Sequence, residues 1–247
     1  MSREKVSTRY RVEDVRLSYS EEKAQDELYG EWVSHYIYRP MSFYVTPFFL
    51  HLGFSPSKVT LLSLMLVFTL PFVALGLPLP YLFIGLIAVV ISVFDCVDGN
   101  IARVTGNVSQ TGHYFDFLTD IIYRVLFYLA IGIVINQTAD TPELLLGIAT
   151  ECLLFAALLA IIARMCRVYF AHEFAKSDDV DQSQSHSSKS WLDNYLFPFV
   201  SGLDWGLPFI VIIFGFLGML HWVLIWLLFY STLDFLHTQY SVFSKLR

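Results

Sequence analysis

Four aspartates stand close together in an otherwise apolar part of the chain. Asp95 and Asp98 are three residues apart, and Asp116 and Asp120 are four residues apart. Residues with these spacings share one face of a helix. The short turn at 105–109 predicts that the two helices are consecutive and antiparallel, so that the four carboxylates converge.

Carboxylates inside a membrane need a compensating partner. An ionisable group at the bilayer centre costs about 2.5–3.5 kcal/mol on insertion scales, and like charges this close also repel one another. Divalent cations remove both costs, and ligand sets made only of oxygen favour Mg²⁺ or Mn²⁺. The four acids therefore predict a metal site that can hold two ions about 4 Å apart.

Small residues and one arginine lie near the aspartates. Gly99, Ala102 and Gly112 leave room for a flat ligand against the helix backbone. Arg103 ends the first helix of the pair, where its guanidinium can meet a pyrophosphate. Glycines in membrane helices also serve helix packing, so each glycine taken alone has a purely structural interpretation.

Together these residues match the pattern Asp-x2-Asp-Gly-x2-Ala-Arg-x8-Gly-x3-Asp-x3-Asp. The pattern resembles the signature of the CDP-alcohol phosphotransferase (CDP-alcohol phosphatidyltransferase) family, and all eight fixed positions are present. The similarity extends to the Ser55-Pro56-x-x-Val59-Thr60 segment and covers about residues 30–240. Ser57 departs from it, because many relatives have Asn or Asp there, which affects a helix-cap contact.

The resemblance implies metal-dependent transfer of a phosphate-linked group from a CDP-linked donor to an alcohol, with release of CMP, in phospholipid biosynthesis. The metal ligands would be Asp95, Asp98, Asp116 and Asp120. Asp120 would be a metal ligand or the general base that takes the proton of the acceptor hydroxyl. The cytidine diphosphate would lie along Asp98, Gly99, Ala102, Arg103 and Gly112. The family is commonly dimeric, so a homodimer is compatible with the resemblance.

The identity of the substrates stays open. CDP-diacylglycerol is the favoured donor, with a small polar acceptor such as a polyol, a sugar phosphate or an amino alcohol. The alternative is transfer from CDP-choline or CDP-ethanolamine to a diacylglycerol. Arg164 and Arg167 share one helix face and suit an anionic acceptor or a lipid phosphate, although snorkelling to headgroups is an equal alternative.

Arg124 and Glu151 lie deeper and are predicted to form an ion pair, because an unpaired charge there is costly.

The composition predicts an all-α integral membrane protein. Of 247 residues, 55% are hydrophobic and 15% are charged, whereas soluble domains carry about 25% charged residues. Apolar stretches of about 20 residues predict transmembrane helices. About six are expected, at 57–77, 80–104, 109–137, 142–170, 202–219 and 221–244.

The N-terminal part differs from the rest. Residues 1–38 are expected to form a polar arm and an amphipathic helix on the membrane surface, and residues 39–247 the membrane domain. Within 21–38, Leu28, Trp32, His35 and Tyr36 recur at helical spacing and would contact the headgroups.

The basic residues predict the orientation. None of the 16 Lys and Arg residues falls in the proposed outer turns at 77–80, 136–143 and 219–221. Since Lys and Arg favour cytoplasmic segments, both termini and the active site are expected on the cytoplasmic side.

Other functions agree less well with the sequence. A net charge of −6 argues against nucleic acid as a partner, because no basic stripe is present to meet its phosphates. Membrane prenyltransferases also use Asp-rich helices and Mg²⁺ but lack the Asp-Gly-x-x-Ala-Arg core. An ion-coupled transporter would account for buried carboxylates but not for Arg103 or the two glycines. A catalytically inactive relative would be expected to have lost a motif position.

Overall fold

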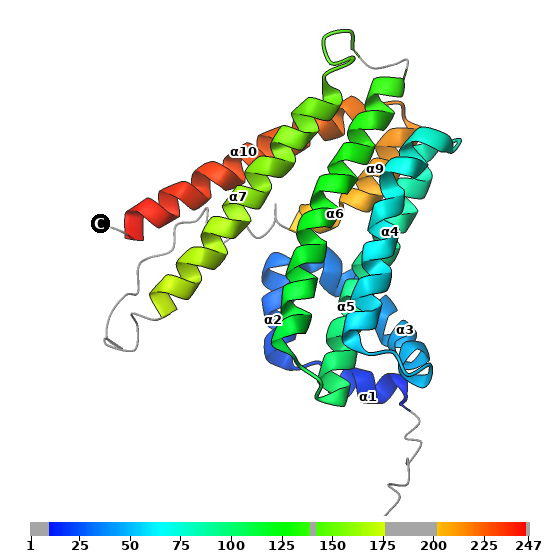
Figure 1. Ribbon diagram of the computed structural model, residues 1–247, viewed down its shortest axis with the longest axis vertical. Coiled ribbons are helices and arrows are strands. Elements are labelled where there is room, and N and C mark those ends of the chain that lie inside the picture. The colour runs from blue at the N-terminus through cyan, green and yellow to red at the C-terminus, as the bar shows by residue number, and fades with distance from the viewer. Residues whose placement is uncertain (1–9, 139–141, 176–201, 246–247) are drawn as a thin grey trace, which may run out of the picture.

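The computed structural model of the protein describes residues 10–138, 142–175 and 202–245. Every regular element in these residues is helical (Figure 1). Five helices are long and apolar enough to cross a membrane. They are α4 (Pro56–Gly76), α5 (Pro80–Thr105), α6 (Gln110–Gln137), α7 (Ala149–Ala175) and α10 (Leu220–Lys245). The predicted all-α membrane fold is confirmed.

The predicted span at 202–219 is not confirmed as a crossing. It contains α9 (Leu207–Phe216), which has 10 residues. At about 1.5 Å per residue, a helix of this length covers about half of a bilayer core. The described residues therefore support five crossings and one short apolar helix, and they leave the expected count of six open.

Proline and glycine mark the ends of the helices that carry the motif. Pro56 and Pro80 occupy the first positions of α4 and α5, where proline suits the helical backbone and no amide hydrogen bond is lost. Gly106 ends α5 with φ 66°, a left-handed conformation that favours glycine. Ser109 then caps α6, because its Oγ accepts a hydrogen bond from the amide of Gly112 at 3.0 Å.

The described N-terminal residues 10–51, called the N-terminal arm from here on, fold onto the membrane helices as several short helices. These are α1 (Val12–Leu17), α2 (Glu21–Gly30), the π-helix η1 (Ser34–Tyr38) and α3 (Arg39–His51). The single surface helix expected at 21–38 is interrupted at Glu31, which lies between α2 and η1. Leu28 and Tyr36 of the predicted stripe are exposed, whereas Trp32 and His35 are half-buried. Part of the expected membrane-facing stripe therefore packs inside the protein.

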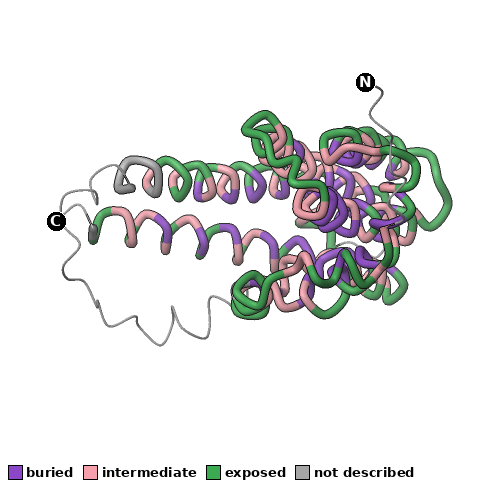
Figure 2. Tube along the Cα trace, turned by 90° about the horizontal axis from the view of Figure 1, so that it is seen from below, coloured by how far each residue is buried: buried purple, intermediate pink, exposed green. Residues whose placement is uncertain are grey.

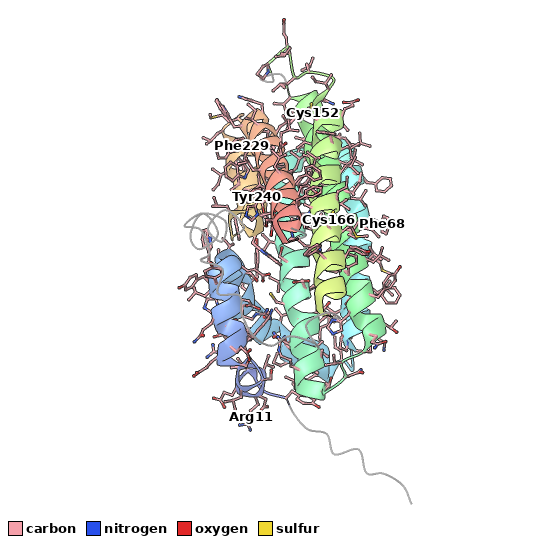
Figure 3. All side chains as sticks on the ribbon, turned by 90° about the vertical axis from the view of Figure 1, so that its left-hand side faces the viewer. Arg11, Phe68, Cys152, Cys166, Phe229 and Tyr240 are labelled. Carbon is pink, nitrogen blue, oxygen red and sulfur yellow. The ribbon has the colours of Figure 1, made fainter. Side chains whose placement is uncertain are left out.

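The long helices pack in a chain of neighbours. α4 lies against α5 and α6, α6 against α7, α7 against α10, and α9 against α5. α7 and α10 run side by side and lean away from the other helices (Figure 1). Buried residues line the inner sides of the helices in Figure 2. Phe68 and Phe229 are 51% and 59% exposed and lie toward opposite edges of Figure 3, as expected for side chains that face lipid.

Two helix ends are joined by the amide of Asn136. Its Oδ1 accepts hydrogen bonds from the backbone N–H groups of Gly147 at 3.1 Å and Ala149 at 3.3 Å. Its Nδ2 donates to Oγ1 of Thr150 at 2.9 Å. This α6–α7 connection lies at the opposite end of the molecule from α1 and the α5–α6 turn (Figure 1). The arm and the turn between the two halves of the motif therefore share one end.

Candidate active site

Three of the four motif aspartates form a compact cluster between α5 and α6. One carboxylate oxygen from each of Asp95, Asp116 and Asp120 lies within 4.8 Å of the others, and all three residues are half-buried. Because the α5–α6 turn is short, the two helices run back along each other and bring these faces together. Hard oxygen ligands at this spacing fit a divalent cation such as Mg²⁺ or Mn²⁺.

Asp98 lies apart from this three-carboxylate cluster, next to a cavity. It is only 8% exposed, and its Oδ2 accepts a hydrogen bond from Oγ1 of Thr60 at 2.6 Å. Thr60 belongs to α4, so three helices meet here. Asp116 lines the same cavity and belongs to the cluster as well, which links the two parts of the site.

The cavity has a volume of about 120 Å³ and lies between the N-terminal end of α4 and the ends of α5 and α6. Four of the five residues predicted to bind the nucleotide line it: Asp98, Gly99, Ala102 and Gly112. The remaining lining residues are Pro56, Ser57, Thr60, Asn107, Val108, Ser109, His113 and Asp116. His113 is exposed and lies at the cavity wall.

The two motif glycines have close neighbours on the cavity side. A Cβ at Gly112 would lie 3.1 Å from Oγ of Ser109, the atom that caps α6. A Cβ at Gly99 would lie 3.4 Å from Nη1 of Arg103. Glycine at position 112 therefore allows the tight cap, and glycine at position 99 keeps the helix surface flat beneath the arginine.

Arg103 lies beside the cavity, with its guanidinium against Gly99. Its Nη2 donates to Oδ1 of Asn100 at 2.6 Å. Its Nε is buried and has no hydrogen-bond partner among the described residues. The guanidinium is thus held through Nη2 by Asn100, while other N–H donors of Arg103 remain for a ligand.

The two arginines of α7 have acidic partners. Nη2 of Arg164 lies 2.5 Å from Oδ2 of Asp120, a member of the three-carboxylate cluster. Nη1 of Arg167 donates to Oδ1 of Asp234 and Oγ1 of Thr238 on α10, both at 2.7 Å. Arg164 therefore borders the cluster directly, whereas Arg167 ties α7 to α10.

The predicted ion pair between Arg124 and Glu151 is wrong. Nη2 of Arg124 lies 2.9 Å from Oδ2 of Asp204, and Glu151 is exposed. The prediction depended on depth along the two helices, which does not fix the direction of a side chain, and Glu151 is exposed. Asp204 comes from a segment just before α9, 80 residues further along the chain.

Two residues near the site, Asn100 and Glu31, were not singled out from the sequence. Asn100 contacts Arg103, and Glu31 lies close enough for the charge of Asp120 to act on it. Burial raises the pKa of Glu31, and the negative charges of Glu27 and Asp120 act in the same direction. The position of Asn100 inside the motif could have drawn attention to it, whereas Glu31 lies far from the motif in sequence.

Residues 54–233 match the family model described as CDP-alcohol phosphatidyltransferase. No match was found among curated proteins. The matched segment begins just before α4 and ends within α10, so it contains both halves of the motif, the cavity and the three-carboxylate cluster. The chain belongs to the CDP-alcohol phosphatidyltransferase family.

Proposed function

We propose that this transferase moves a phosphatidyl group from CDP-diacylglycerol to the hydroxyl of a small polar alcohol and releases CMP, in phospholipid biosynthesis. Membership of the family already means transfer of a phosphate-linked group from a CDP-alcohol to an alcohol. The proposal adds the donor, the acceptor class, the metal ions and the residue roles. The observation that carries it is the approach of Asp95, Asp116 and Asp120 to within 4.8 Å of one another.

Divalent ions, Mg²⁺ or Mn²⁺, would be held by these three acids together with Asp98. The donor set fits such ions, since carboxylate oxygens are the ligands they prefer. When bound, two ions would neutralise charge on the transferred and the departing phosphates. Thr60 supports this role by fixing one oxygen of Asp98.

The nucleotide would occupy the cavity beside the acids. Gly99, Ala102 and Gly112 give it a flat wall. Arg103 would direct its remaining N–H donors to the diphosphate, which a guanidinium recognises by shape and charge.

Asp120 would take the proton of the acceptor hydroxyl. The acceptor oxygen then attacks the phosphorus distal to cytidine and forms the new P–O bond. The bond from this phosphorus to the bridging oxygen breaks, and CMP leaves with the electron pair. A carboxylate within hydrogen-bond reach of the hydroxyl makes this step feasible near neutral pH.

Arg164 and Arg167 would attract an anionic acceptor or the phosphate of a lipid donor. Arg164 is the stronger candidate, because it already contacts Asp120. In Arg167 the guanidinium is engaged with Asp234 and Thr238, so a phosphate would have to share it with them.

The site and both termini would lie on the cytoplasmic side of the membrane. The distribution of Lys and Arg supports this orientation. The common end of the arm and the α5–α6 turn (Figure 1) is consistent with it. Labelling by a membrane-impermeant reagent of a cysteine introduced at Val108, in intact and opened cells, would test the orientation.

The activity is tested by CMP release from the purified full chain. CDP-diacylglycerol, CDP-choline and CDP-ethanolamine would each be offered with polyols, sugar phosphates, amino alcohols and diacylglycerol. Release from CDP-diacylglycerol with a water-soluble acceptor supports the proposal, and release only from CDP-choline or CDP-ethanolamine with diacylglycerol contradicts it. A transporter would release no CMP with any pair.

Metal dependence is tested in the same assay. Chelation of divalent ions should abolish CMP release, and Mg²⁺ or Mn²⁺ should restore it. Asp116→Asn should remove activity and weaken Mn²⁺ binding by the purified chain, because it takes one oxygen ligand from the three-carboxylate cluster. Asp14→Asn, an exposed Asp on α1, is the matched control and should keep both.

A further inference from the structure

A buried polar network connects the N-terminal arm to the motif helix α5. At its centre is Arg39, the first residue of α3, which is only 7% exposed. Its Nε donates to Oε2 of Glu27 at 3.0 Å, and its Nη2 pairs with Oε1 of the same carboxylate. Glu27 is 1% exposed and also accepts a hydrogen bond from the hydroxyl of Tyr19 at 2.7 Å. The charge of Arg39 is therefore matched within the arm.

The remaining guanidinium nitrogen of Arg39, Nη1, contacts α5. It donates to the backbone oxygen of Cys96 at 3.3 Å and to Oδ1 of Asn100 at 3.2 Å. The two contacts are one helical turn apart on α5. Arg39 therefore binds α5 on both sides of Asp98 and Gly99 in the sequence, at Cys96 and Asn100.

Asn100 uses both ends of its amide. It is completely buried, and its Nδ2 donates to Oγ of Ser42 at 2.9 Å and Oγ1 of Thr46 at 3.1 Å. Its Oδ1 accepts from Arg39 at 3.2 Å and from Nη2 of Arg103 at 2.6 Å. An amide held on both sides cannot rotate, so the oxygen offered to Arg103 has a fixed position.

The charges in the network leave Arg103 available to an anion. Glu27 and Arg39 form a pair, whereas Arg103 is held by a neutral oxygen and carries a full positive charge. The nearby Arg39 guanidinium also opposes any inward rotation of Arg103 toward Glu27. The side chain is therefore kept along Gly99, which lines the cavity.

We infer that Glu27, Arg39 and Asn100 are positioning residues that orient Arg103 toward the diphosphate of the CDP-linked donor. The N-terminal arm, which lies outside the motif, thereby completes the nucleotide site. This inference rests on the proposed function in assigning Arg103 to the diphosphate.

The test measures binding of CDP to the detergent-purified full chain in the presence of Mg²⁺. Arg39→Lys keeps a positive charge beside Glu27, but one ammonium cannot serve both carboxylate oxygens, the Cys96 carbonyl and Asn100. We expect the Kd of CDP to rise about tenfold, the equivalent of losing one hydrogen bond to a charged group. Arg103→Ala should weaken CDP at least as much, and the double variant should resemble Arg103→Ala alone.

Two further variants keep the test decisive. Arg16→Lys makes the same change on the same arm, at an exposed arginine that contacts Tyr44, and should leave CDP binding unchanged. Asn100→Ala removes the shared acceptor without altering either arginine, and it is measured in the same way if Arg39→Lys does not fold.

The outcomes separate this inference from the proposed function. If Arg103→Ala leaves CDP affinity unchanged, the assignment of Arg103 fails and the inference fails with it. If Arg103→Ala weakens CDP but the network variants lower only the thermal stability, or their effects add to that of Arg103→Ala, the inference alone is overturned.

Discussion

Nη2 of Arg164 lies 2.5 Å from Oδ2 of Asp120 and joins α7 to α6 through an ion pair. The two side chains are 35% and 33% exposed, so water and solutes can reach the pair. An acceptor that carries a phosphate would meet this arginine next to the proposed base. Under the proposed function, this pair would place the acceptor-binding arginine beside the general base.

Replacement of Arg164 should affect the acceptor more than the nucleotide. We expect Arg164→Ala to raise the KM of an anionic acceptor about tenfold or more, since a charge-assisted hydrogen bond is lost. The Kd of CDP should change much less. Initial rates at varied acceptor concentrations provide the measurement, and an unchanged KM with a normal kcat would exclude Arg164 from acceptor binding.

Arg167→Ala offers the comparison one turn further along α7. If Arg167 also binds the acceptor, its loss raises the same KM. If the contacts with Asp234 and Thr238 are its whole role, the KM stays constant and only the thermal unfolding midpoint falls.

The hydroxyl of Thr60 should matter because it is the partner of a buried carboxylate. Thr60→Val preserves the shape of the side chain but leaves Oδ2 of Asp98 without its 2.6 Å donor. An unmet buried acceptor costs about 1–3 kcal/mol, so CMP release should fall about tenfold or more. Thr69→Val removes an exposed hydroxyl from the same helix, one that donates only to the carbonyl of Leu66, and should keep the rate. Equal rates for the two variants would contradict a role for Thr60.

The ion pair between Arg124 and Asp204 should stabilise the fold rather than the reaction. Its side chains are 25% and 16% exposed, and removal of one partner from such a pair costs about 3 kcal/mol. We expect Asp204→Asn to lower the unfolding midpoint while the rate per folded molecule is retained. Glu151→Gln changes the exposed position that was expected to pair with Arg124, and it should leave both the unfolding midpoint and the rate unchanged. Comparable losses in both variants would be incompatible with the observed partner.

Glu27 should make stability depend on pH in the acidic range. Burial opposes its ionisation, but the hydrogen bonds and charge of Arg39 outweigh burial and hold the pKa below the ordinary value of 4.5. A lowered pKa in the folded state means that the stabilisation is complete above 4.5 and is lost as the pH falls below it. Glu27→Gln should therefore be less stable than the wild type near neutrality, and the gap should narrow in acid. Thermal unfolding of both proteins across this range is the measurement, and a constant gap would refute the assignment.

Local helical geometry explains why much of the site could be predicted. Asp116 and Asp120 must share a face of α6 because they are four residues apart, and a turn that contains Gly106 must return the chain beside α5. The start of α5 at Pro80 follows from the same kind of short-range rule. These predictions needed no knowledge of how distant segments pack.

The remaining contacts depend on packing between segments far apart in sequence. Asp204 reaches Arg124 across 80 residues, and Arg39 reaches Asn100 across 61. No periodicity links such residues, so the sequence offered Glu151 as the nearest acid at a suitable depth. The partner of Asp98 is likewise distant in sequence, because Thr60 on α4 donates to it across 38 residues.

Both the oxygen and the nitrogen of the Asn136 amide form hydrogen bonds in the connection between α6 and α7. The same residue begins an Asn-Gln-Thr triplet, the acceptor sequence for N-linked sugar. Attachment would replace a hydrogen of Nδ2, the atom that donates to Thr150, in the half-buried space between the two helix ends. Glycosylation at this triplet would compete with loop closure, so a glycan reporter for this side of the membrane should be engineered at another position.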